Sequence, residues 1–340
     1  MAFDPDAAGL PGSGIFGLPF TRGQAGIVLV PVPFEATTSY GQGAAQGPGA
    51  ILRASMQVDL YDRRFGRVYE RGIFMEEPDG RIVELCEAAR DAAAPILLRG
   101  GADSGDHAAV ARVDAAGDEL NGIVHAKVAQ ILAEGKAPGL VGGDHSTPFG
   151  AIRACAEAAG EGGLGILHID AHMDFRRAYE GFRWSHASIM HNVLTRVPGV
   201  SRIVQVGIRD FGEGELALAA EQGPRVVTFY DDQWAEEMAG GTGFLGLARR
   251  AVEALPDRVY ISFDIDALDP SLCPHTGTPV PGGLPFNQAV LLLDALRQSG
   301  KRVVGFDLVE VSPGPEGDEW DGNVGARVLY KLCGAAGPQR

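Results

Sequence analysis

Acidic and histidine side chains alternate in the segment DAHMD, which follows the apolar run LGILHI. In extended backbone, alternate residues point to the same side, so Asp170, His172 and Asp174 can converge on one point. Asp264 and Asp266, which end the run VYISFDID, share this alternate spacing. Carboxylates packed side by side at strand ends repel one another and lose hydration unless cations neutralise them. The spacing therefore predicts a metal site.

His145 follows a third apolar run, in LVGGDHS, and completes the set of candidate ligands. In an open α/β sheet, ligands bind outside the carboxyl ends of the strands, where all three segments are expected to lie. Carboxylates and imidazoles without a thiolate favour Mn²⁺ over structural zinc, although Co²⁺, Ni²⁺ or Fe²⁺ would also suit them. Asp144 and His168 are expected to orient ligands rather than to bind the ions. The predicted metal ligands are His145, Asp170, His172, Asp174, Asp264 and Asp266.

An alternative interpretation makes each of these aspartates a helix cap or loop residue and each histidine a core residue. That interpretation is sufficient for any one of them taken alone. Capping seldom places several ligand-type residues at alternate spacing after two different strands, so the whole set favours the metal site.

Short apolar, β-branched runs alternate with helical patterns along the chain, which predicts a parallel sheet in an α/β domain. Most runs are apolar at nearly every position, as expected of strands covered by helices on both faces. Two Ala-rich helices are expected within residues 80–135, separated by a turn at 101–106. The expected strands span residues 27–32, 164–169, 202–206, 225–229, 258–264 and 302–309.

No linker or internal repeat divides the chain, so we expect a single catalytic domain over residues 24–340. Residues 1–23 lack the basic and apolar regions of a secretion signal and are predicted to form a flexible arm. No apolar run reaches the ~18 residues that a membrane span requires. The four cysteines are far apart and form no CxxC pair, which is typical of reduced thiols and predicts a cytoplasmic location.

The formal net charge is −15, from 29 basic and 44 acidic residues, and no Lys/Arg-rich run interrupts it. Such a surface repels a phosphate backbone over most of its area. We therefore expect a small-molecule substrate, and neither nucleic acid nor a membrane as a partner.

Three segments, GGDHS, DAHMD and SFDIDALDPSLCPHTGTPVPGG, together resemble the metal-site motifs of the ureohydrolase superfamily, which includes arginase, agmatinase, formimidoylglutamase and guanidinobutyrase. The likeness extends from VPVPFEATTSYGQGAAQGPGAILRAS to FDLVEVSP, so it covers nearly the whole chain. It implies an arginase-like, three-layer α/β/α domain with a mostly parallel central sheet. It also implies a pair of Mn²⁺ ions bridged by hydroxide, the ligand roles already given, and a homo-oligomer such as a trimer or hexamer.

The resemblance also implies roles outside the metal set. His186, in WSHAS, stands where the family has the His of an HG dipeptide that moves protons, although an alanine replaces the glycine. Glu310, in DLVEVSP, stands where a family carboxylate holds the substrate guanidinium or amidine. A lone glutamate at the end of an apolar run is costly without such a role. Further predicted site residues are His191 and Thr278 for substrate contact and Asp174 for catalysis.

The activity that the resemblance implies is hydrolysis of a guanidino compound to urea and an amine, by attack of the bridging hydroxide. An agmatine-like substrate is favoured, because PFEATTSYGQG and TGTPVPGG are closer to agmatinase-like members than to arginases. Residues 182–193 and 320–334 depart from the agmatinase pattern. Arg176, Arg177 and Arg183 are either ordinary solvated arginines or suit a carboxylate-bearing substrate. The alternatives are therefore formimidoylglutamase or arginase activity, or a non-catalytic binding protein on the same fold.

Overall fold

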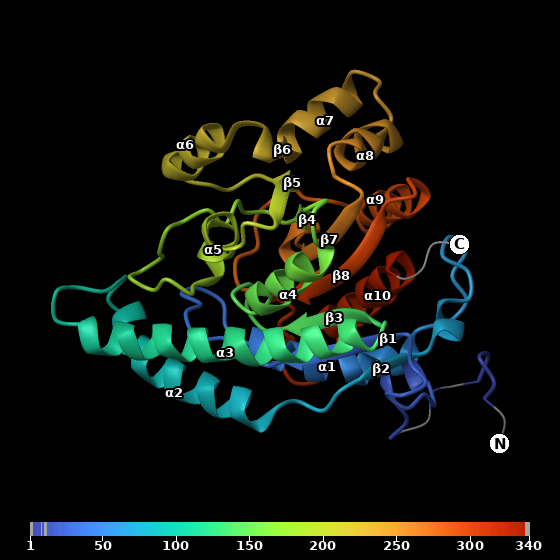
Figure 1. Ribbon diagram of the computed structural model, residues 1–340, viewed down its shortest axis with the longest axis horizontal. Helices are drawn as coiled ribbons and strands as arrows, with labels where there is room; N and C mark the ends of the chain where they lie inside the picture. Colours follow the sequence, from blue (N-terminus) through green and yellow to red (C-terminus); the bar gives the residue numbers. More distant parts are fainter. Residues whose placement is uncertain (1–2, 8, 10–11, 337–340) are drawn as a thin grey trace.

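A single parallel sheet of eight strands forms the centre of the computed structural model, which describes residues 3–7, 9 and 12–336 (Figure 1). Its strand order is β2-β1-β3-β8-β7-β4-β5-β6, so β3, β8, β7 and β4 are neighbours in the middle of the sheet. Each strand pairing is parallel. The strands are β1 (Ile27–Val32), β2 (Ile73–Met75), β3 (Ala137–Gly142), β4 (Leu164–Ile169), β5 (Val200–Ile208), β6 (Val226–Tyr230), β7 (Arg258–Asp264) and β8 (Arg302–Val309).

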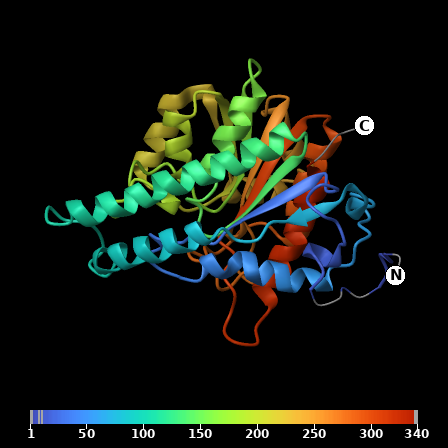
Figure 2. The same ribbon diagram turned by 60° about the horizontal axis from the view of Figure 1, so that its bottom comes forward.

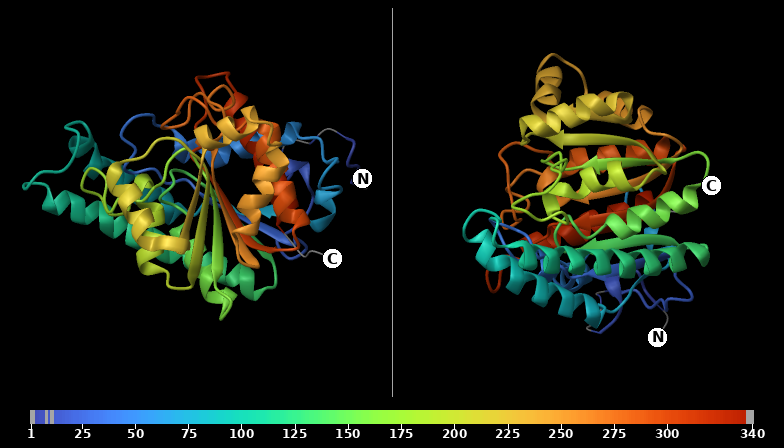
Figure 3. Two further views of the ribbon diagram at one scale, coloured as in Figure 1. Left: turned by 90° about the horizontal axis from the view of Figure 1, so that it is seen from above. Right: turned by 60° about the vertical axis from the view of Figure 1, so that its left-hand side comes forward.

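Helices cover both faces of this sheet and complete a three-layer α/β/α fold (Figure 3). Helices α2 to α6 pack on one face, and α1 and α7 to α10 pack on the other. The α-helices are α1 (Gly47–Ala54), α2 (Gly80–Leu97), α3 (His107–Ala133), α4 (Phe149–Ala159), α5 (Ile189–Arg196), α6 (Glu213–Gln222), α7 (Asp231–Ala239), α8 (Phe244–Glu253), α9 (Phe286–Gln298) and α10 (Trp320–Ala335). Short 3₁₀ helices are η1 (Ile15–Gly17), η2 (Ala44–Gln46), η3 (Ser55–Gln57), η4 (Val68–Arg71), η5 (His186–Ser188), η6 (Gly223–Arg225) and η7 (Ile265–Ala267).

The strands are buried along almost their whole length because a separate apolar core lies on each face of the sheet. Along β4, Ile166 packs into the core under α2 to α5, and the next residue, Leu167, packs into the core under α7 to α10. This alternation is the two-residue period of a strand. It explains why neither face of the central strands is exposed to solvent.

The predicted fold class and most of the predicted elements are confirmed. Helices α2 and α3 flank the predicted turn and lie side by side, as Figure 2 shows. Strands β2 and β3 were not predicted. The first has three residues, and the second carries Pro138 and Gly139, which are depleted in strands.

The predicted arm at residues 1–23 packs against the domain in part, because Ile15, Phe16 and Leu18 are buried in the core. The boundary at residue 23 stays a prediction. Residues 1–2, 8, 10–11 and 337–340 of the predicted arm and domain lie outside the described residues. In the part of the chain that is described, none of the helices combines the length and the apolar character of a membrane span.

Candidate active site

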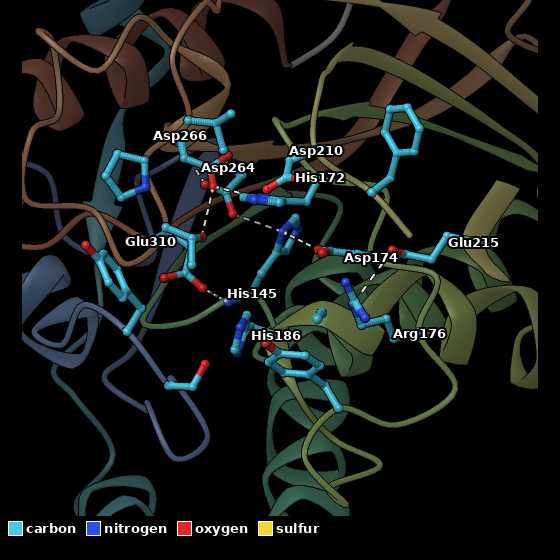
Figure 4. A pocket seen from close by; sticks show the side chains of 18 residues that line it. His145, His172, Asp174, Arg176, His186, Asp210, Glu215, Asp264, Asp266 and Glu310 are labelled. Atoms are coloured by element: carbon cyan, nitrogen blue, oxygen red, sulfur yellow. Dashed lines mark hydrogen bonds and ion pairs between the residues drawn. The ribbon is translucent and has the colours of Figure 1, made fainter. Parts of the chain in front are cut away.

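The carboxyl ends of the four central strands meet at one edge of the sheet and surround a cavity of about 310 Å³ (Figure 4). His145 follows β3, and Glu310 follows β8. Asp264 ends β7, and the segment 170–174 follows β4. Because these strands are neighbours and parallel, segments that are far apart in the sequence reach the same place.

The Nδ1 atom of His145 lies at the centre of three carboxylates. It is 2.9 Å from Asp170 Oδ2, and 3.1 Å from an Oδ2 of each of two further aspartates, Asp174 and Asp264. These side chains are almost fully buried. Nδ1 nevertheless makes no hydrogen bond of acceptable geometry to any of them. A buried nitrogen that faces three carboxylate oxygens without hydrogen bonding to them matches what a cation requires.

A second group of candidate ligands adjoins the first and shares Asp170 with it. His172 Nδ1 lies 3.0 Å from Asp266 Oδ2 and 3.6 Å from Asp170 Oδ1. The ligand atoms of these three residues lie within 4.8 Å of one another, as do those of the group formed by His145, His168, Asp170 and Asp174. The geometry therefore offers two adjacent positions for cations.

Hydrogen bonds beneath His145 fix which of its nitrogens is free to bind a cation. Its Nε2 lies 2.9 Å from Ser262 Oγ, and that hydroxyl donates to Asp307 Oδ1 at 3.1 Å. The hydroxyl hydrogen is thus used, so Ser262 accepts from an Nε2–H of the imidazole. When the ring is neutral, the lone pair of Nδ1 then faces the carboxylates, which is the tautomer that a metal ligand needs.

Several carboxyl groups of the site have raised pKa values when no cation is bound. Burial raises the pKa of Asp264 well above its usual range, and the nearby Asp266 and Asp170 add to this effect. Burial also raises the pKa of Asp174, next to Asp170, to about 6. Such a cluster has more negative charge than the protein alone stabilises, so its electrostatics also fit bound cations.

Two site residues, Asp174 and Glu310, have left-handed backbone with φ values of 57° and 62°. Non-glycine residues seldom adopt this conformation unless surrounding bonds hold them in it. The Asp174 carbonyl accepts from two backbone N–H groups at the start of α5. The N–H of the following residue, Phe175, donates to Glu215 Oε1 at 2.9 Å. Glu310 N donates to Gly143 O at 2.8 Å, and its carbonyl accepts from Thr276 Oγ1 at 2.8 Å.

Glu310 faces the cavity near the candidate ligands (Figure 4). Its Oε1 accepts from His145 N at 2.8 Å, and its side chain is buried. Burial raises its pKa well above the usual range, with added repulsion from Asp264 and Asp144. A cationic ligand beside this carboxylate would reverse that effect.

His186 lines the same cavity, and its buried Nδ1 has no hydrogen-bond partner within the described part of the chain. Burial, and next the charges of His172 and His145, lower its pKa to about 4. Its ring is therefore neutral near pH 7 when no cation or substrate is bound. Thr278 also lines the cavity, with its hydroxyl 3.4 Å from Asp266 Oδ2.

Some residues singled out from the sequence do not line this cavity. His191 is not among its lining residues, and neither is Arg177. Arg183 pairs with Asp118 at 2.7 Å and stacks on Trp184, so its charge is used outside the site. The proposed substrate contact of His191 stays a prediction.

The outer part of the cavity contains residues that the sequence pattern did not reveal. Asp210 lies two residues after the end of β5, so the search for polar residues after apolar runs that marked the candidate metal ligands could have found it. Glu215 comes from the first turn of α6. The others come from loops without a repeating pattern and are Ser39, Tyr40, Tyr179, Phe211, Pro279 and Val280.

Comparisons with known proteins show which family this chain is similar to. The sequence model of the arginase family matches residues 25–334. The N(1)-aminopropylagmatine ureohydrolase of Thermus thermophilus is 35% identical over 318 residues, which are 93% of this chain and 92% of that protein. The guanidinopropionase of Pseudomonas aeruginosa is 37% identical over 207 residues, which are 60% of this chain and 62% of that protein. The agmatine ureohydrolase of Thermoplasma volcanium has a similar fold, with a TM-score of 0.72 and 24% identity over 95% of this chain and 94% of that chain.

Proposed function

Because this chain belongs to the arginase family, we propose that it hydrolyses a guanidino compound with a cationic tail to urea and an amine. The chain is a hydrolase of C–N bonds in linear amidines, with a binuclear metal site. The observation that carries the proposal is the convergence of three carboxylates on the free Nδ1 of His145, with Glu310 in the same cavity.

In this proposal the six candidate ligands, His145, Asp170, His172, Asp174, Asp264 and Asp266, hold two divalent cations. When bound, such cations acidify water, so that hydroxide is available near neutral pH to attack a planar guanidinium carbon. We propose Mn²⁺, because the donor set has carboxylates and imidazoles and no thiolate; Co²⁺, Ni²⁺ or Fe²⁺ would suit the same donors.

Glu310 binds the guanidinium. Its buried carboxylate matches a planar cation in charge and in paired hydrogen-bond geometry. Its backbone N–H donates to Gly143 O and its Oε1 accepts from His145 N, so the side chain is held before substrate arrives. Orientation of this kind places the guanidinium carbon toward the candidate ligands and lowers the barrier through proximity.

His186 moves a proton during the reaction. Its ring lines the cavity, and its Nδ1 has no hydrogen-bond partner among the described residues. We propose that it takes up a proton at the reacting centre and passes it to the amine as that amine leaves.

The outer cavity favours a cationic tail on the substrate. Asp210 is exposed at the rim, and no group among the described residues hydrogen-bonds to its carboxylate. Arg176 is the arginine that lines this region. Its Nε lies 3.7 Å from Glu215 Oε2, and its Cζ lies 5.0 Å from the centroid of the Tyr179 ring. The free charge is thus negative, which suits an agmatine-like amine.

A carboxylate-bearing guanidino substrate is the second candidate. Arg176 is solvent-accessible, and its contact with Glu215 is longer than a hydrogen bond, so a substrate carboxylate can compete for it. The similar guanidinopropionase adds weight to this candidate. For arginase or formimidoylglutamase activity, we propose the same role for Arg176 with the substrate carboxylate.

We also propose a cytoplasmic homo-oligomer. The described structure leaves Cys86, Cys155, Cys273 and Cys333 as buried free thiols, which suits a reducing compartment. The trimer or hexamer implied by the sequence resemblance remains the expected assembly, and size-exclusion chromatography with light scattering would measure it.

A substrate panel tests the proposed activity. The protein is loaded with Mn²⁺ and assayed for urea with agmatine, N(1)-aminopropylagmatine, arginine, 4-guanidinobutyrate and 3-guanidinopropionate. Formamide release is assayed with formiminoglutamate. We expect the highest kcat/KM with a cationic guanidino amine. Preference for a carboxylate-bearing guanidine would select the second candidate, and inertness toward the whole panel would contradict the proposed function.

A further inference from the structure

Five polar side chains occupy one row across the sheet, directly beneath the candidate metal ligands. The register pairs Thr228 of β6 with Gln205 of β5, Gln205 with His168 of β4, His168 with Ser262 of β7, and Ser262 with Asp307 of β8. All but Thr228 are fully buried. We call these five residues the polar row.

Buried polar groups in the middle of an apolar sheet are costly unless each has a partner with a defined role. The row residues His168 and Ser262 each stand two positions before a candidate ligand, Asp170 and Asp264, on the same face of their strands. Ser262 and Asp307 orient His145, because Ser262 Oγ accepts from His145 Nε2 and donates to Asp307 Oδ1. The other part of the row consists of His168, Gln205 and Thr228, and Gln205 connects the other two.

The amide of Gln205 has a determined orientation. Its Nε2 donates to Met173 O at 2.9 Å, and a backbone carbonyl can only accept, so the NH₂ group must face it. The same NH₂ group lies 3.0 Å from His168 Nδ1, while Gln205 Oε1 accepts from Thr228 Oγ1 at 2.9 Å. Both amide hydrogens are therefore assigned, one to Met173 and one to His168.

This arrangement determines the tautomer of His168. Because its Nδ1 accepts from Gln205, the neutral ring carries its proton on Nε2. Nε2 lies 2.8 Å from Asp170 Oδ2, so it donates to that carboxylate. A protonated nitrogen has no lone pair for a cation, so His168 does not coordinate a metal, although its Nε2 lies close to three candidate ligands.

We propose that Gln205 is a positioning residue of the metal site, a role that rests on the proposed function. Through His168 it orients Asp170, the carboxylate shared by both candidate cation positions. Through Met173 O it holds the other end of the same segment, next to Asp174 with its left-handed backbone. One buried amide thus fixes the geometry of the segment 170–174 from both ends.

Substitution of Gln205 tests this role by metal affinity as well as by activity. Gln205→Met keeps an unbranched side chain of similar length and removes both donors. We expect Mn²⁺ affinity at one or both positions to fall by ~10- to 100-fold, the usual effect of losing a group that orients a ligand. The affinities are measured by competition with a chelator. Thr228→Val is the matched control, because it removes the bond to Oε1 and leaves both N–H donors; its effect should stay below about threefold.

The tautomer of His168 can be read directly in the unsubstituted protein. Long-range ¹H–¹⁵N correlation spectra of the Zn²⁺-loaded protein distinguish protonated from unprotonated ring nitrogens, and His168→Gln identifies the signals. We expect protonated Nε2 and unprotonated Nδ1. His168→Gln keeps a donor near the Nε2 position, so it should retain more Mn²⁺ affinity than His168→Leu. If Gln205 acts through His168, Gln205→Met should lower Mn²⁺ affinity less in the His168→Leu background than in the parent protein.

Two outcomes would overturn the proposal: a His168 ring with its proton on Nδ1, or a Gln205→Met protein whose two Mn²⁺ affinities stay within about threefold of the parent. Neither would touch the proposed function if the parent still binds two ions and releases urea. If instead the parent binds no Mn²⁺ and is inert, the proposed function itself fails. The tautomer measurement then still tests the hydrogen bond between Gln205 and His168. Should Gln205→Met not fold, the spectra of the parent and the His168 pair of variants decide the question.

Discussion

The inner and outer halves of the cavity are built in different ways. Inner residues such as His145 and Asp170 lie at the ends of central strands, are almost fully buried, and are held by hydrogen bonds. Outer residues come from loops, and Tyr40 and Phe211 are 83% and 36% exposed. The inner half is a rigid framework for chemistry, and the outer half is a surface where the tail of the substrate is selected. Substitutions should therefore affect kcat in the inner half and KM in the outer half.

Removal of the cations should give the largest effect, because it takes away the chemistry of the inner half. We expect urea release to fall by at least ~10⁴-fold after chelation and dialysis, since free water is far less acidic than water bound to a divalent cation. Activity should return on addition of Mn²⁺. Circular dichroism before and after chelation controls for unfolding. Activity that survives thorough chelation would contradict a metal-dependent hydrolase.

His186→Ala should lower kcat by ~10²- to 10⁴-fold, the typical contribution of a general acid–base residue. Because the side chain is proposed to move protons, metal content measured by elemental analysis should remain at two ions per chain. An unchanged rate at saturating substrate would show that His186 is a loop residue without a catalytic role.

Glu310→Gln preserves size and removes the charge that is proposed to pair with the guanidinium. We expect kcat/KM to fall by ~10²- to 10³-fold with both metals retained, as for the loss of one charge-stabilising group in an active site. Loss of metal would instead identify Glu310 as a ligand. The clamp role is wrong if kcat/KM stays within about threefold of the parent, which corresponds to ~0.7 kcal/mol.

Asp210→Asn should have the smallest effect and should act on binding. We expect KM for agmatine to rise by about fivefold with kcat almost unchanged, because an exposed charge pair contributes at most about 1 kcal/mol. Arg176→Gln is the matched change at the same rim and should leave agmatine hydrolysis nearly unaffected. The reverse pattern, with Arg176 limiting the use of 3-guanidinopropionate, would favour the carboxylate-bearing substrate.

Local sequence patterns were enough to identify the inner half. Alternation within DAHMD and DID places side chains on one side of an extended segment whatever the rest of the fold does. Apolar runs predicted most strands, and their ends located the candidate ligands. Strand β3 was not recognised because its proline and glycine are untypical of strands, although the polar residues after it were identified as site residues.

Residues of the outer half could not be found in this way. Tyr40 and Phe211 lie in segments without a repeating pattern, and each reaches the cavity only because the ends of β1 and β5 lie beside the central strands. Arg176 and Arg183 illustrate the same limit. Both are arginines and lie seven residues apart, yet Arg176 lines the cavity, whereas Arg183 pairs with Asp118 and does not line it.

By itself the sequence determined the fold class, the family resemblance and the candidate ligands, because these depend on residue types and on spacings within single segments. Tertiary structure alone decided which strands are neighbours, in which register they pair and which loops border the cavity. The polar row is the clearest case, since Gln205, His168 and Ser262 belong to three segments whose alignment depends on long-range packing. Strand order and register are set by how two cores close on both faces of the sheet, and no local spacing carries that information.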